Sequence, residues 1–199
     1  MKRILFALTA LTLAACLAAC ASPEAAASPS PAPSATVSET AAATATSPAD
    51  YEALGFDLMD SETLGDVKLG MTESELIAKL GKPDKQSDAE VWGADGLKHA
   101  DWTYTALGLT INMSESANPE SEFVSYSISA EAPCALATAK GVKIGDGKDA
   151  VITAYGYAVQ DQSDEGTKDS IVAGSVYGGV IFDMTDGKVT SIFIGAAAE

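Results

Sequence analysis

An internal repeat constrains the fold of this 199-residue chain more than any other feature of its sequence. Residues 67–70, Val-Lys-Leu-Gly, precede a helix-like run that ends at Gly81. The sequence Val-Lys-Ile-Gly at residues 142–145 follows 75 positions later, without a gap, and precedes a similar run that ends at Gly156. Two further blocks recur in the same order, residues 108–113 with 179–184 and residues 124–128 with 189–193. Three blocks in one order predict two tandem copies of one small unit.

Each copy carries the signals of a short helix followed by antiparallel strands. Thr72 and Glu75 have the spacing of a capping box, and Leu80 is expected to anchor the first helix in the core. Asp146 is the expected N-cap of the second helix. The segments downstream alternate apolar and polar residues with a period of two, which is typical of a sheet with one buried face. The predicted fold class is therefore α+β, with about three to four antiparallel strands in each copy.

The first residues of the chain have the pattern of an export signal. Two basic residues open it, and residues 4–17 are then almost wholly apolar. This stretch is shorter than the about 20 residues that cross a bilayer, but it has the length of a signal-peptide core. Residues 17–20, Leu-Ala-Ala-Cys, resemble the lipobox of bacterial lipoproteins. That resemblance implies cleavage after residue 19 and a diacylglycerol lipid on Cys20. The alternatives are a second match at residues 13–16 and an ordinary secretory signal.

Residues 20–50 are predicted to form a disordered tether, because they consist mainly of Ala, Ser, Pro and Thr and contain five prolines. The folded part then comprises a first repeat with a leading segment, residues 51–138, and a second repeat, residues 139–199. We expect it to be held on the extracytoplasmic surface of a bacterial membrane by the lipid on Cys20.

Charge and cysteine content narrow the function classes. Loss of Lys2 and Arg3 with the signal lowers the formal net charge from −16 to −18. Such a chain repels nucleic acid and anionic lipid headgroups, so no nucleic-acid partner is expected and membrane attachment requires the lipid.

Cys134 has no intramolecular partner once Cys20 is lipidated. A buried, unreactive thiol is favoured over a reactive one at Cys134, because free cysteines are usually buried.

The first repeat resembles a known family. Residues 69–72, Leu-Gly-Met-Thr, and residues 80–83, Leu-Gly-Lys-Pro, are similar to the signature of the small outer-membrane-assembly lipoproteins of the SmpA/OmlA (BamE) type. Two such units in tandem resemble the β-lactamase-inhibitory proteins. The resemblance implies helices on one face of a sheet, an open face opposite, and a protein-binding role. No functional residue carries over, because the matching positions belong to helix caps and the core.

The sequence offers no convincing catalytic or metal-binding constellation, so neither a catalytic residue, a metal nor another cofactor is predicted. His99, with Asp95 or Asp101 as partners, is more simply an exposed loop histidine. The acidic segment 161–166 lacks the spacing of a calcium-binding EF-hand loop and is more simply solvated. The favoured function is non-enzymatic binding of a protein or a cell-envelope component. The alternatives are a hydrolase of envelope polymers that uses paired carboxylates, and a structural spacer.

Three isoleucines mark a candidate binding surface. In the repeat alignment, Ile181, Ile192 and Ile194 fall on the face opposite the helix, where the first copy carries small polar residues. An exposed apolar cluster at these positions predicts an interaction site. The alternative is that the segment after the tether covers them, through Tyr51, Leu54, Phe56 and Leu58.

Overall fold

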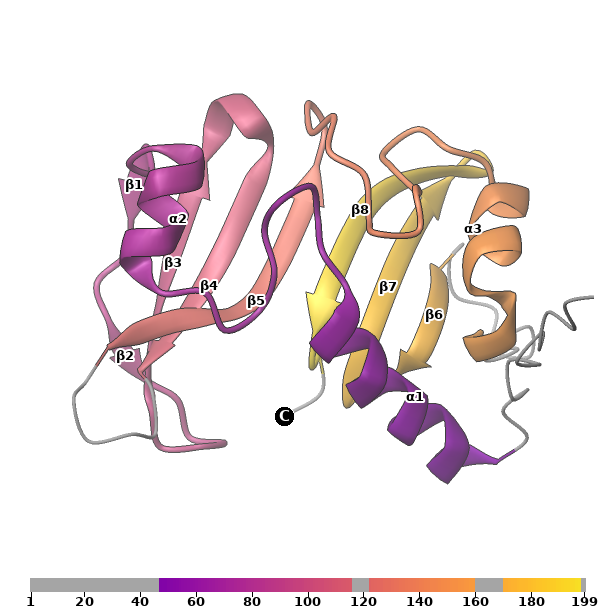
Figure 1. The fold of residues 1–199 in the computed structure, drawn as a ribbon, viewed down its shortest axis with the longest axis horizontal. Helices are drawn as coiled ribbons and strands as arrows, with labels where there is room; N and C mark the ends of the chain where they lie inside the picture. Colours follow the sequence, from indigo (N-terminus) through magenta and orange to yellow (C-terminus); the bar gives the residue numbers. More distant parts are fainter. Residues whose placement is uncertain (1–46, 116–121, 160–169, 198–199) are drawn as a thin grey trace, which may run out of the picture. The chain divides into compact units, whose positions relative to one another are not determined.

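The computed structural model describes residues 47–115, 122–159 and 170–197, all within one of two compact units, Ala41–Glu199. Cys20, the signal segment and the acidic segment 161–166 lie outside the described residues. The described residues form an α+β fold with one antiparallel sheet (Figure 1). Its helices and strands are α1 (Pro48–Ser61), α2 (Glu73–Leu80), β1 (Lys85–Gln86), β2 (Glu90–Val91), β3 (Lys98–Tyr104), β4 (Leu109–Glu115), β5 (Phe123–Glu131), α3 (Lys148–Tyr155), β6 (Ser170–Ser175), β7 (Gly178–Thr185) and β8 (Lys188–Gly195).

The sheet is continuous across the two halves of the unit. Its strand order is β1-β3-β4-β5-β8-β7-β6, and β2 pairs with β3 beside this path. We call β1–β5 the first half and β6–β8 the second half. Antiparallel pairing of β5 with β8, in which Ile128 lies opposite Ile194 and Ala130 opposite Ile192, joins the halves into a single sheet. The strands of both halves therefore belong to one sheet.

The short helices begin where local hydrogen bonds favour them. Thr72 and Glu75 form the expected capping box at α2, with Glu75 N–H donating to Thr72 Oγ1 and Thr72 N–H donating to Glu75 Oε2. The expectation for the second helix is wrong. Gly147 is the N-cap of α3, and the Asp146 carboxylate instead accepts a hydrogen bond from Lys143 N–H.

Helix α1 corrects the predicted extent of the tether, since it begins at Pro48. Ser47 and Asp50 form a second capping box there, and proline is favoured at the first helical position because no backbone N–H is needed. The helix packs on β6 and β7 of the second half, although it precedes the first half in sequence. A side chain on Gly55 would collide with the carbonyl of Gly178, so this close approach requires glycine.

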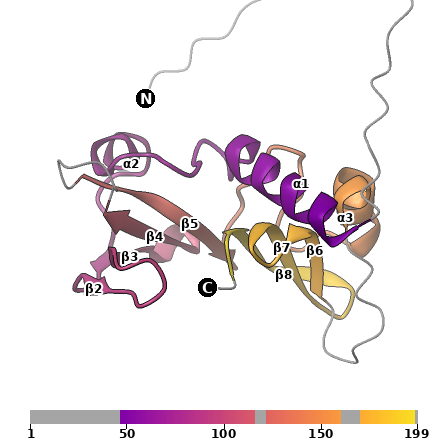
Figure 2. The same cartoon turned by 90° about the horizontal axis from the view of Figure 1, so that it is seen from below.

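All three helices lie on one side of the sheet (Figure 2). The hydrophobic core lies between these helices and the sheet, and it contains residues from both halves. Leu76 of α2 and Val151 of α3 are fully buried, whereas the residues that follow them, Ile77 and Ile152, are exposed. These pairs are separated by the repeat distance of 75 residues, so the two helices bury the same helical positions.

A buried polar cluster links α1, the connection between the halves and α3. The Glu62 carboxylate at the end of α1 accepts hydrogen bonds from Tyr155 O–H at 2.7 Å and Ala139 N–H at 2.6 Å. The Tyr155 ring also packs against Phe182 of β7. Because a buried carboxylate is costly unless its oxygens are hydrogen-bonded, this cluster fixes the positions of α1 and α3 over the sheet.

Candidate functional site

The side of the sheet opposite the helices is the candidate site, and we call it the open face. No helix among the described residues lies on it (Figure 2). Partners in the strand ladders point to the same side, so the pairings define its residues. One row crosses both halves and consists of Lys85, Thr103, Thr110, Ser129, Phe193, Ile181 and Val172.

Two of the three predicted surface isoleucines are in the core instead. Ile192 and Ile194 have an exposed fraction of 0% and lie on the helix side, so they are not exposed for binding in this structure. The prediction for these two residues is wrong because a β-bulge at Thr190 in β8 interrupts the alternation after Val189, so that Val189, Ile192 and Ile194 all face the core. By its place in the strand ladder Ile192 corresponds to Ile128, whereas the sequence repeat pairs Ile128 with Phe193, one residue further on. A shift of one residue moves a strand's side chains to the opposite face.

The predicted cover is present in part. Leu58 of α1 is buried in the core, and Leu54 packs against it. Phe56, by contrast, is exposed. Ile181 lies on the open face as predicted and is partly exposed.

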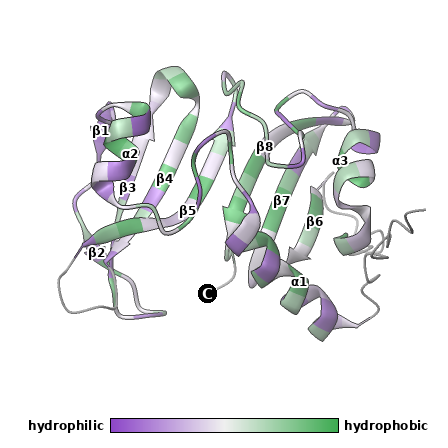
Figure 3. Ribbon diagram, viewed as in Figure 1, coloured by the Kyte–Doolittle hydropathy of each residue, from purple (hydrophilic) through white to green (hydrophobic). Residues whose placement is uncertain are grey.

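The second half of the open face is apolar. Phe193 and Ile181 are direct cross-strand partners, and Val172 is buried on the far side of Ile181. The Phe193 ring lies beside Gly195, where an added side chain would contact the ring. Figure 3 shows β6, β7 and β8 coloured mainly hydrophobic, whereas β3 and β4 are paler. The partly exposed apolar pair of the open face, Phe193 and Ile181, therefore belongs to the more hydrophobic half of the sheet.

The first half of the open face is built around His99. This residue is in β3 with an exposed fraction of 2%, so the interpretation as an exposed loop histidine is wrong. Trp92, in the loop between β2 and β3, stacks on the imidazole with ring centroids 3.8 Å apart. Tyr126 meets the imidazole edge-on at 4.9 Å. Aromatic pairs of this kind each add about 0.5–1.5 kcal/mol beyond burial, so the cluster holds the loop against the sheet.

Hydrogen bonds on both sides of the ring fix the orientation of His99. Asn112 Nδ2 donates to Asp101 Oδ1 at 2.8 Å, which directs Asn112 Oδ1 toward His99 Nδ1 at 2.7 Å. On the other side of the ring, Nε2 lies 2.9 Å from Asp95 Oδ2. Both ring nitrogens therefore face side-chain oxygen atoms, which hold the imidazole in one orientation. The N–H of Leu97 and, second, the contact with His99 lower the pKa of Asp95 below its ordinary value.

This geometry does not suit nucleophilic catalysis. Ser114 Oγ lies 3.4 Å from His99 Nε2, but Ser114 has an exposed fraction of only 3% and its hydroxyl donates to the Glu115 carbonyl. Both groups are buried, and Trp92 covers the imidazole of His99. The cluster instead presents a fixed aromatic and polar surface. The sequence signal for it was the alternation of His99, Asp101 and Thr103 along β3, which places His99 in a strand.

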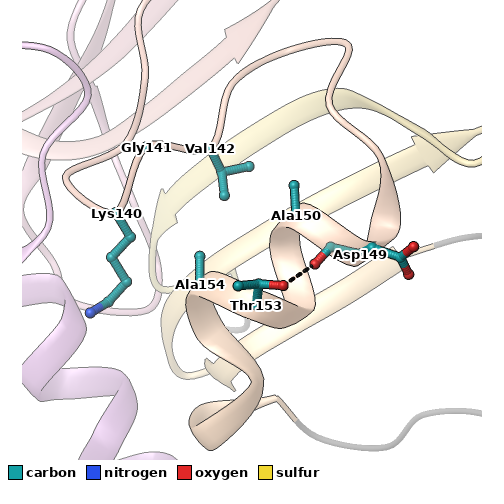
Figure 4. Close-up of a pocket in the computed structure, with 7 residues that line it drawn as sticks. All are labelled: Lys140, Gly141, Val142, Asp149, Ala150, Thr153 and Ala154. Atoms are coloured by element: carbon teal, nitrogen blue, oxygen red, sulfur yellow. Dashed lines mark hydrogen bonds between the residues drawn. The ribbon is translucent and has the colours of Figure 1, made fainter.

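A hollow on the helix side is the other place that a ligand could occupy. It has a volume of about 630 Å³ and lies between α3 and the loop at Lys140 (Figure 4). The Thr153 hydroxyl is already bonded to the Asp149 carbonyl (Figure 4). The Lys140 ammonium lies over the rings of Tyr155 and Tyr157, 5.7 and 5.2 Å from their centroids. Its polar groups do not converge, so the hollow does not define a ligand site.

Cys134 is a buried free thiol, which confirms the interpretation as a buried residue. Within the described ranges, no group of three His, Cys, Asp or Glu side chains is placed to hold a metal ion. No helix in the described part of the chain is both long and apolar enough to cross a membrane.

No protein-family model, curated protein or solved structure matches this chain. The candidate site therefore stands on its geometry alone.

Proposed function

We propose that this chain is a lipid-anchored, extracytoplasmic binding module that holds a protein or a cell-envelope component on its open face without catalysing a reaction. The observation that carries the proposal is the partly exposed pair Phe193 and Ile181 at the centre of a sheet face that no described helix covers. Apolar side chains at the centre of a polar surface are typical of protein-binding sites.

We also propose that the fold arose from two tandem copies of one helix-plus-sheet unit, as in the BamE-type and β-lactamase-inhibitory families that the sequence resembles. Two correspondences support this. The buried residues Leu76 and Val151 are one repeat distance apart, and the β-bulges at Tyr126 and Thr190 fall at matching places in their ladders. In this proposal the first copy keeps a polar open face and the second carries the apolar part.

The lipid anchor rests on the sequence. Cleavage before Cys20 would leave a tether of low-complexity sequence between the membrane and Ser47. Mass spectrometry of the mature protein tests the anchor directly, and the expected product begins at Cys20 with a lipid modification. A mature chain that begins at another residue contradicts it.

Binding through the open face is tested with the full chain carrying Cys20→Ser, which keeps it lipid-free. Three such chains are immobilised and exposed to envelope extract: one with no further change, one with Ile181→Asp and one with Ile152→Asp. Ile152 is the matched control, because it is an isoleucine on the helix side with an exposed fraction of 40%. The expected result is a component that binds to the chain with no further change and to Ile152→Asp, but not to Ile181→Asp. Retention that is equal in all three chains, or absent from all, contradicts the proposal.

A further inference from the structure

Carboxylates surround the apolar centre of the open face. Asp183 is two residues beyond Ile181 on β7 and points to the same side. Its ladder partner is Ser191, whose other partner is Glu131 on β5. Asp183 and Glu131 are thus the diagonal neighbours of Phe193 on the two adjacent strands, at a spacing of roughly 7–8 Å that long side chains can bridge.

These carboxylates have no cationic partner. Asp183 and Glu131 are both exposed, and neither forms an ion pair in the part of the chain that the structure describes. Lys188 is the one basic residue in β6, β7 and β8, and its backbone pairs with Gly147 at the end of the sheet. The negative charge beside Phe193 is therefore not neutralised by these strands.

The first half of the open face also has a net negative charge. Its described strands carry one lysine there, Lys85 on the edge strand β1, against the two acidic residues Glu90 and Asp101. Asp101 is exposed on the open face of β3, and its carboxylate accepts its hydrogen bond from the neutral amide of Asn112. His99 Nε2 is already paired with the Asp95 carboxylate at 2.9 Å, so His99 does not compensate Asp101. The formal net charge of −16 for the whole chain acts in the same direction. This net negative charge disfavours an anionic partner and favours a cationic one.

We infer that the open face binds a protein surface that presents arginine or lysine beside aliphatic side chains, with the aliphatic groups on Phe193 and Ile181 and the cationic groups at Asp183 and Glu131. Apolar contact removes water from the edges of the site, which strengthens the neighbouring charge pairs. Arginine suits the site better than lysine, because its guanidinium binds carboxylates in two parallel hydrogen bonds and stacks on aromatic rings. This inference rests on the proposed function and specifies the chemistry of the partner.

Three end-blocked heptapeptides test the inference on the lipid-free full chain: alternating valine and arginine, alternating valine and glutamate, and alternating serine and arginine. Binding is followed by NMR of the isoleucine methyl groups, so that Ile181 reports the open face and Ile152 the helix side. The valine–arginine peptide is expected to shift the Ile181 signal and not that of Ile152. Each of the other two peptides is expected to bind at least tenfold more weakly, because one lacks the positive charge and the other the aliphatic groups.

A charge reversal sharpens the test. Asp183→Lys is expected to weaken binding of the valine–arginine peptide at least tenfold, whereas Asp149→Lys on exposed α3 makes the same change in net charge and is expected to alter it less than threefold. Similar binding of the valine–arginine and valine–glutamate peptides, equal effects of the two variants, or an unmoved Ile181 signal would each overturn the inference. If that happens while envelope extract still yields an Ile181-dependent partner, only the partner chemistry is refuted and the binding function stands.

Discussion

The two halves of the sheet are alike on the helix side and different on the open face. On the helix side, Ile111 and Ile128 of the first half correspond to Phe182 and Ile192 of the second, and all four are fully buried. On the open face, the first half is polar and aromatic around His99, whereas the second is apolar around Phe193. The helix side has to fill a close-packed core, so its residue types are restricted. The open face is free of that requirement, and the difference between the halves therefore points to function.

The largest effect is expected from comparing two isoleucines on adjacent strands, Ile192 and Ile181. Ile192→Asp places an unpaired carboxylate in the core and is expected to cost more than about 4 kcal/mol, enough to unfold much of the protein. Ile181→Asp is expected to cost less than about 1 kcal/mol, because the new carboxylate reaches water. Circular dichroism during urea unfolding measures both. Equal losses of stability would show that the two faces are wrongly assigned.

The next comparison concerns the short helices. Leu76→Ala is expected to lower the free energy of unfolding by about 2–5 kcal/mol, since it leaves a cavity beneath α2. Val151→Ala in α3 removes fewer carbon atoms and should cost less. Leu80 is only partly buried, so Leu80→Ala should fall below Leu76→Ala. Ile77→Ala, on the exposed side of α2, is the control. A larger effect for Ile77 than for Leu76 contradicts the observed orientation of α2.

Tyr155 distinguishes the second half from the first, in which Leu80 occupies the corresponding position. Tyr155→Phe removes a hydrogen bond to the buried Glu62 carboxylate and is expected to cost about 1–3 kcal/mol. Tyr104→Phe removes a longer bond, 3.3 Å, to the Gly81 carbonyl and should cost about 0.5–1.5 kcal/mol. Thermal unfolding at neutral pH ranks the two variants. The reverse order would mean that the hydrogen bond from Tyr155 contributes little to the stability of the buried Glu62 carboxylate.

Tyr155 is also expected to make the free energy of unfolding fall as the pH rises above 10. Burial, as the main cause, raises the pKa of Tyr155 far above its ordinary value of 10.0. Below pH 10 the phenol is protonated in both the folded and the unfolded chain, so its contribution is fully present. Above that value the unfolded chain releases the proton more readily, and stability falls as the pH rises. The slope of unfolding free energy against pH between 10 and 11 should be shallower in Tyr155→Phe than in the wild type.

The smallest effect is expected at the loop that Trp92 anchors to the first half. Because the pKa of Asp95 is lowered in the folded chain, its contribution is present above the ordinary value of 3.8 and is lost as the pH falls through the folded value. Asp95→Asn should give at neutral pH the Trp92 fluorescence that the wild type shows only in acid. Asp88→Asn, an exposed acid before β2, should leave the fluorescence unchanged. An identical acid transition in the wild type and Asp95→Asn would rule out this role for Asp95.

Short-range patterns gave reliable predictions. The capping box of α2 followed from Thr72 and Glu75, since both partners lie within one helical turn. The antiparallel strands followed from alternation over a few residues, and the α+β class followed from these elements together. Helix α1 was missed because the low-complexity composition around Pro48 concealed the cap at Ser47, and its stability comes from packing on distant strands β6 and β7.

The sequence by itself determined helix α2 and the alternating strands of the first half, because capping and alternation act over a few residues. Tertiary structure alone decided which isoleucines face the core and which face outward. The β-bulges at Tyr126 and Thr190 depend on pairing with β4 and β7, and each reverses the faces of the residues beyond it. Pairing between β5 and β8 likewise decided that His99 and Phe193 share one open face, because residues 94 positions apart in the chain meet only through the completed sheet.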